Sequence, residues 1–260
     1  MKQMGLLTFV LLLAGPAMEQ VPPGNAERPA RKASEVSKGP GEFTFVRTIY
    51  SSPFGRRRWG SWATDYPNAD YHFIRGIRYW SGANLNISAE PEQIPIMDDR
   101  LFDYPLIYFV EPGYLSLSAE EAGRLREYVA RGGFLWLDDF WGDYEWDNVR
   151  EQMRMIFPDR VIDDLPLDHP VFHTYFDIDE VVQVPGIGAW LGGGVTYEKG
   201  GIVPHYMGIQ DDKGRLVVFI ARNCDLGDAW EWIDDPRYPI KYGLAAYRVG
   251  INVIMYAMSH

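Results

Sequence analysis

One stretch decides the predicted fold: Gly132-Gly133-Phe134-Leu135-Trp136-Leu137-Asp138-Asp139-Phe140-Trp141-Gly142. Its first half is typical of a buried strand, because apolar residues run without interruption between two glycines and two aspartates. The strand then ends abruptly in two carboxylates, an aromatic pair and a glycine. The stretch therefore predicts a central strand with Asp138 and Asp139 at its carboxyl end.

The residues before this strand predict a helix and a second strand. Ser118 suits the N-cap of a helix that runs to about Arg131, and Glu121 completes a capping box. Gly132 and Gly133 end that helix, since glycine readily takes the left-handed conformation that many helix ends need. Residues 105–111 are typical of another buried strand. Strand, helix and strand form a βαβ unit, whose crossover is right-handed and whose strands are parallel.

Parallel strands bring their carboxyl ends to one edge of a sheet, where ligands bind in open α/β folds. We expect Glu111, Asp138 and Asp139 to lie on that edge, which we call the rim. A first strand at 43–50 leads to a polar loop that carries Arg57, Arg58 and Asp65 to the same rim. The remaining pattern predicts helices at 68–80, 147–157 and 240–258, and a hairpin at 205–223 whose turn is formed by 211–214.

Composition excludes some classes of partner. The chain has 260 residues, 47% of them apolar, and a formal net charge of -11. An acidic chain repels the phosphates of DNA and RNA, so nucleic acid is not an expected partner. The single cysteine, Cys224, excludes a disulfide within the chain and a cysteine-based zinc site. The last predicted helix holds Lys241 and Arg248, which argues against a membrane span in the mature chain.

The first residues are typical of a signal peptide. Lys2 is followed by an apolar run over 5–13 and by small residues that end at Ala17. We therefore predict a signal peptide over residues 1–17, a disordered linker over 18–41 and one α/β domain over 42–260. The protein would then be periplasmic or secreted, and an uncleaved anchor is the alternative.

Cleavage after Ala17 is a testable consequence. N-terminal sequencing of the protein from the envelope fraction of the cells that make it is expected to begin at Met18. An intact Met1 on a cytoplasmic protein would contradict both the cleavage site and the compartment.

Four stretches carry a resemblance to a bacterial family, the domain of unknown function 4159: DYPNAD at 65–70, FLWLDD at 134–139, LPLDHPV at 165–171 and GINVIMYA at 250–257. The alternation of strands and helices, with Arg131-Gly132-Gly133-Phe134 before the central strand, resembles the class I glutamine amidotransferase-like superfamily. That resemblance implies a flavodoxin-like three-layer α/β sandwich with a mainly parallel central sheet, here with an added β-hairpin.

The superfamily resemblance also implies a nucleophilic cysteine on the turn after the central strand. This chain has Asp138 and Asp139 there, and Cys224 follows the hairpin instead. A carboxylate does not replace a thiolate in amide cleavage, so no glutaminase activity is expected. The chain is also similar to sugar-utilisation relatives of the superfamily, which lack the cysteine and act on or bind carbohydrates.

The candidate catalytic residues are Asp139 and His169, because an Asp–His pair can serve as a general base at neutral pH. The alternative roles are structural: an N-cap or an arginine salt bridge for the carboxylates, and a hydrogen bond within a rigid loop for His169. A metal site from Asp139, His169 and a third ligand is a further alternative. His72, His173 and His205 are scattered, without the i, i+4 spacing of a helical zinc pair among them, so no metal or cofactor is expected.

The candidate ligand-binding residues gather charge and aromatic surface at the predicted rim: Arg57, Arg58, Asp65, Glu111, Asp138, Trp141 and Trp230. Aromatic rings can stack on sugar faces while carboxylates accept hydrogen bonds from hydroxyls; the alternative is that the rings anchor loops in the core. The sequence therefore predicts an exported domain that binds a small molecule, such as a saccharide, or an envelope protein. The alternative is a hydrolase that uses Asp139 and His169.

Overall fold

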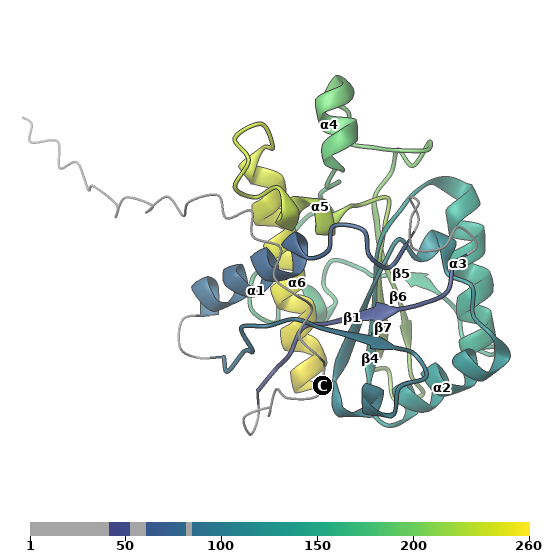
Figure 1. Ribbon diagram of the computed structural model, residues 1–260. Helices are drawn as coiled ribbons and strands as arrows, with labels where there is room; N and C mark the ends of the chain where they lie inside the picture. The colour runs from purple at the N-terminus through teal and green to yellow at the C-terminus, as the bar shows by residue number, and fades with distance from the viewer. Residues whose placement is uncertain (1–41, 53–60, 82–84) are drawn as a thin grey trace, which may run out of the picture. The chain divides into compact units, whose positions relative to one another are not determined.

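The computed structural model describes residues 42–52, 61–81 and 85–260 (Figure 1). The predicted signal peptide, the predicted linker, Arg57 and Arg58 lie outside these residues. Within the described ranges, no helix combines the length and the apolar character that crossing a membrane requires.

A seven-stranded sheet forms the centre of the domain, with strand order β2-β1-β3-β4-β7-β6-β5. Five strands are parallel: β2 (Glu92–Pro95), β1 (Val46–Ile49), β3 (Leu106–Val110), β4 (Phe134–Phe140) and β7 (Leu216–Arg222). The strands β6 (His205–Gln210) and β5 (Asp163–Asp164) extend the sheet in the antiparallel sense. The α/β class, the mainly parallel sheet and the hairpin of β6 and β7 are confirmed, and the arrangement is consistent with a flavodoxin-like sandwich.

Helices cover both faces of the sheet (Figure 1). One face packs against α1 (Asn68–Ser81), α5 (Leu226–Glu231) and α6 (Ile240–Ser259). The other face packs against α2 (Ala119–Ala130) and α3 (Gly142–Ile156). Successive strand residues point to opposite faces, so Tyr108 and Trp136 enter the first core while Phe109 and Leu137 enter the second. The strands are therefore apolar throughout because both faces are buried.

The predicted βαβ unit is present with its expected ends. The Ser118 side chain accepts a hydrogen bond from the N–H of Glu121, and the Glu121 side chain accepts one from the N–H of Ser118, which completes the capping box. Gly132 follows the helix with φ of 104°, a conformation that favours glycine. Val110 then pairs with Asp138, which aligns the carboxyl ends of β3 and β4.

Some elements differ from the prediction. The helix expected at 147–157 begins earlier, at Gly142, so it starts directly behind the carboxyl end of β4. Residues 226–231 form α5 and residues 187–193 form α4 (Ile187–Gly193), where only loops were expected. Both helices are short, and periodicity is a weak signal over six or seven residues. They matter because α5 carries part of the candidate site.

Candidate functional site

The loops that leave the sheet at the rim contain four non-glycine residues with positive φ. Glu111, Asp139 and Asn223 follow or end strands β3, β4 and β7, and Asp65 lies in the loop between β1 and α1. Their φ angles are 47°, 59°, 58° and 61°, respectively. Asp and Asn tolerate this left-handed conformation better than most residues because their short side chains form hydrogen bonds with the nearby backbone. Each position makes a sharp turn that directs a polar side chain along the rim.

Asp138 has a structural position beneath the rim. Its side chain is fully buried and accepts hydrogen bonds from the Tyr108 hydroxyl at 2.8 Å and from the N–H groups of Leu226 and Gly227, each at 3.1 Å. Burial raises the pKa of Asp138 to about 7, and the three donors partly offset this rise. Asp138 therefore connects β4 and β3 to the N-terminus of α5.

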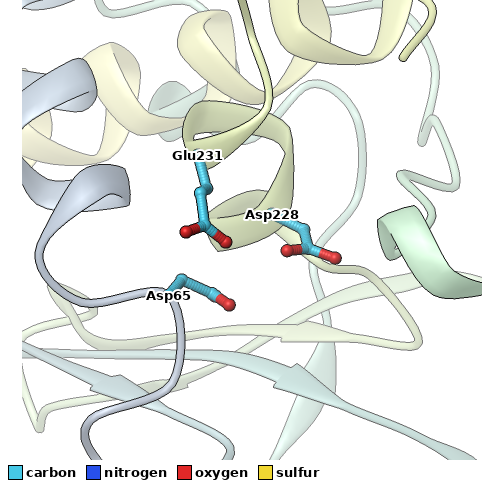
Figure 2. A group of neighbouring side chains, drawn as sticks. All are labelled: Asp65, Asp228 and Glu231. Carbon is cyan, nitrogen blue, oxygen red and sulfur yellow. The ribbon is translucent and has the colours of Figure 1, made fainter. Parts of the chain in front are cut away.

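Six carboxylates from different parts of the chain converge above Asp138, and we call them the acidic rim: Asp65, Asp139, Glu198, Asp225, Asp228 and Glu231. One oxygen from each of Asp65, Asp139 and Asp225 lies within 4.8 Å of the other two. The same is true of one oxygen from each of Asp65, Asp228 and Glu231. Figure 2 shows the second set, in which Asp228 and Glu231 extend from α5 toward Asp65. Asp65 is therefore common to both groups.

Two glycines allow these carboxylates to approach. A Cβ atom on Gly227 would lie 2.5 Å from Oδ2 of Asp65. A Cβ atom on Gly186 would lie 2.5 Å from Oε1 of Glu198 and 3.0 Å from Oδ2 of Asp225. Real Cβ atoms do not come so close to oxygen, so any other residue at either position would require these carboxylates to shift. Glu198 and Gly186 are residues that the sequence did not single out.

Burial and mutual repulsion make the charged form of the acidic rim costly. Asp139, Asp225 and Asp228 are only 7%, 5% and 9% exposed. Burial raises the pKa of all six carboxyl groups, most strongly for Asp65, Asp139 and Asp225. The neighbouring negative charges raise these pKa values further. The charge of Asp228 raises the pKa of Asp65, that of Glu111 raises the pKa of Asp139, and that of Asp139 raises the pKa of Asp225.

The nearest described cations are already engaged. Arg47 is fully buried and donates to both oxygens of Asp70, and to the carbonyls of Trp62 and Thr64 at 3.1 and 2.7 Å. Lys199 donates to Glu145 at 2.6 Å. Burial alone would lower the pKa of both cations, but these carboxylates raise it instead. Neither side chain has a hydrogen bond to the acidic rim among those seen in the described residues.

Glu111 lies at the edge of the predicted site in a structural role. Its carboxylate accepts hydrogen bonds from the N–H of Ser61 at 2.8 Å and from the hydroxyl of Thr64 at 2.6 Å. These contacts hold the chain that leads to Asp65. The structure thus brings Asp65, Glu111, Asp138 and Asp139 to one rim, as the sequence predicts.

The two tryptophans of the predicted site do not offer rings to a ligand. Trp141 is 1% exposed, and its indole N–H donates to Oδ1 of Asp139 at 2.9 Å. Trp230 is 0% exposed and stacks on Phe73 with ring centroids 4.0 Å apart. The alternative of anchoring in the core therefore applies to both. Trp232 is partly exposed beside the acidic rim, and its indole N–H donates to Oδ1 of Asp228 at 3.1 Å.

His169 lies near the amino ends of the parallel strands, whereas Asp139 lies at their carboxyl ends, so the expected pair does not form. The His169 ring lies 5.7 Å from that of Tyr256. The Tyr256 hydroxyl accepts a hydrogen bond from the N–H of Leu216, the first residue of β7, whereas Asp139 stands near the last residue of β4. The sequence could not show that the segment after α3 returns to the amino ends of the strands.

His169 instead acts as an N-cap. Its Nδ1 accepts a hydrogen bond from the N–H of Val171 at 3.2 Å, which requires an unprotonated nitrogen. Burial lowers the pKa of His169, and the charge of Asp168 partly offsets this change. Because the folded-state pKa is depressed, the stability that this histidine contributes is present above its unfolded pKa and is lost as the pH falls.

A titration can test this separation. We expect NMR to give a pKa for His169 below the ordinary value near 6.5, and Asp139→Asn to leave it unchanged. Asp168→Asn is the matched control, and it is expected to lower the pKa because it removes the neighbouring negative charge. If Asp139→Asn lowered the pKa by about one unit or more, the two residues would lie within a few ångströms of each other.

The comparisons with known proteins give a family and no activity. The family model described as "Domain of unknown function (DUF4159)" matches residues 44–258. No match was found among curated proteins. The matched region spans the whole sheet, its covering helices and every carboxylate of the acidic rim. The chain therefore belongs to the DUF4159 family.

Proposed function

We propose that the chain is an exported ligand-binding domain of amidotransferase-like fold, and that its ligand is a hydroxyl-rich molecule of the saccharide class bound at the acidic rim. One observation carries the proposal: six carboxylates from four separate segments meet at the edge where open α/β sheets bind ligands. Export is supported by the charged start, the apolar run and the small residues before Met18.

The charge of the acidic rim selects the kind of ligand. Ionised carboxylates accept hydrogen bonds and donate none, so they favour a ligand rich in O–H or N–H donors. The same carboxylates repel phosphate and carboxylate groups. A neutral or amino saccharide meets both conditions, and a uronic acid does not. Trp232 offers a partly exposed ring beside the carboxylates on which a sugar face can pack.

The superfamily placement is supported by the position of Asp139. Asp139 lies at the end of the central strand and has a left-handed backbone conformation. The resemblance implies that an amidotransferase carries its nucleophile at this place. Cys224 lies one strand away, after β7. Its side chain is buried and contacts the carbonyl of Val182, and burial raises the pKa of its thiol to about 12. A thiol that stays protonated is a poor nucleophile.

The first test concerns the proposed lack of glutaminase activity. Release of ammonia from glutamine is expected to stay at the uncatalysed level for the wild type and to be the same for Cys224→Ser. A measurable wild-type rate that Cys224→Ser abolishes, with the circular dichroism spectrum intact, would overturn the proposal of a non-glutaminase domain.

The hydrolase alternative loses its geometric basis. It needs Asp139 and His169 within hydrogen-bond reach, directly or through one water. The two residues stand at opposite edges of the sheet. Binding at the acidic rim therefore has the stronger support.

The second test concerns the ligand. We expect the mature chain to retain neutral or amino saccharides on a glycan array, in a buffer that contains calcium and magnesium chloride. Asp139→Asn is expected to weaken binding of the retained saccharide at least tenfold, about 1.4 kcal/mol, because it removes a charged acceptor. Asparagine suits the left-handed backbone at this position, so the melting temperature is expected to change little.

Asp159→Asn is the matched control, since Asp159 is exposed and the next residue, Arg160, donates to the carbonyl of Gln210, which pairs with Leu216 at the start of β7, away from the rim. An array on which no saccharide is retained would contradict the proposed ligand class. Equal affinities for the wild type and Asp139→Asn would contradict the proposed place of binding.

A further inference from the structure

Asp65 has a buried oxygen that no donor satisfies. Its Oδ2 atom is shielded from solvent and has no hydrogen-bond partner. Figure 2 shows that the Asp65 carboxylate faces those of Asp228 and Glu231. Buried carboxylate oxygens are normally paired with donors, because an unpaired one loses its hydration without compensation. Asp65 therefore needs a positively charged or donating group at this position.

The neighbours of Asp65 do not meet this need in their ionised form. They are carboxylates, which accept hydrogen bonds and repel one another when ionised. Asp139 and Asp225 each accept one hydrogen bond, from the Trp141 indole and from the N–H of Asp228, and retain further lone pairs. The nearest described cations, Arg47 and Lys199, bind Asp70 and Glu145. When the acidic rim is ionised, the missing group therefore comes from outside the described residues.

The spacing of the oxygens suits one metal ion. Oxygens bound to the same ion at about 2.4 Å lie at most about 4.8 Å apart. One oxygen from each of Asp65, Asp139 and Asp225 meets this limit, and so does one from each of Asp65, Asp228 and Glu231. A glycine at 227 leaves the space that Oδ2 of Asp65 occupies, since a Cβ there would lie 2.5 Å from it. Two sets of three ligands thus meet at one residue.

We propose that the acidic rim binds a hard divalent cation, Ca²⁺ or Mg²⁺, through Asp65, Asp139 and Asp225, with Asp228 and Glu231 adjoining it through the shared Asp65.

The donor set indicates this class of metal. All the ligands are carboxylate oxygens, which suit Ca²⁺, Mg²⁺ and Mn²⁺, whereas zinc and copper prefer sites that include imidazole or thiolate. The thiol of Cys224 contacts the carbonyl of Val182. An ion of charge +2 also offsets the lost hydration of the buried carboxylates and their repulsion of one another.

The cation site goes beyond the proposed ligand binding and does not require it. A cation held at the acidic rim has room in its coordination shell for water or for ligand hydroxyls, so it is compatible with a saccharide. The test below uses the metal ions alone. Failure of the glycan array would leave the cation site standing, and failure of metal binding would leave the ligand proposal open to its own test.

The experiment is calorimetry on the mature chain after treatment with EDTA and dialysis, with CaCl₂ and with MgCl₂ as separate titrants at pH 7.5. Saturable binding of at least one ion, with a higher melting temperature in its presence, is the expected result. Asp65→Asn is expected to weaken binding about 100-fold, because it removes the shared charged ligand. Asp159→Asn is the control and should bind as the wild type does.

The variants are chosen so that a failure to fold cannot mimic a loss of binding. Asparagine tolerates the left-handed conformation at 65, so Asp65→Asn in EDTA should melt at the same or a higher temperature than the wild type, since repulsion is relieved. Asp225→Asn is the second variant, because asparagine can cap α5 in place of aspartate. The proposal is overturned if neither ion produces saturable heat up to millimolar concentration, or if both variants bind as tightly as the wild type.

Discussion

The buried carboxylate of Asp138 is the interaction on which the acidic rim depends. It holds the Tyr108 hydroxyl of β3 and the first N–H groups of α5, so it fixes the helix that carries Asp228 and Glu231. Helix N-termini stabilise negative charge, and the buried position strengthens each of these hydrogen bonds. A single residue at the end of β4 thus joins three elements that are up to 89 residues apart in the chain.

This arrangement gathers more negative charge than its surroundings neutralise. Arg47 lies beneath the rim and is charged, yet it forms a two-oxygen contact with Asp70 and binds two carbonyls. Lys199 is held by Glu145. Repulsion of this kind opposes folding, so its persistence at one edge points to function, as strained and repulsive groups tend to concentrate at binding sites. The hydrophobic cores on both faces of the sheet provide the stability that permits it.

The fold could be predicted from the sequence because local signals agreed with one another. The capping box at Ser118, the glycine pair at 132–133 and the uninterrupted apolar strand all indicated one βαβ unit, and the edge that holds Glu111 and Asp139 followed from it. His169 could not be placed, because the path from α3 to β6 depends on tertiary packing. Trp230 was equally ambiguous: its acidic neighbours indicated a surface loop, whereas α5 turns the ring into the core. Gly186 and Glu198 carried no local signal, since they act through distant neighbours.

The same reasoning explains why tryptophan content alone says little about ligand binding in this chain. Trp136, Trp141 and Trp230 are all buried, and Trp136 and Trp230 pack edge to face with centroids 5.5 Å apart. Such rings stabilise the core and, through Trp141, orient Asp139. The polar atoms of the rim are thus supported by a rigid aromatic layer directly beneath them. A site built on such a layer holds its carboxylates in place before any ligand arrives, which lowers the entropy that binding must overcome.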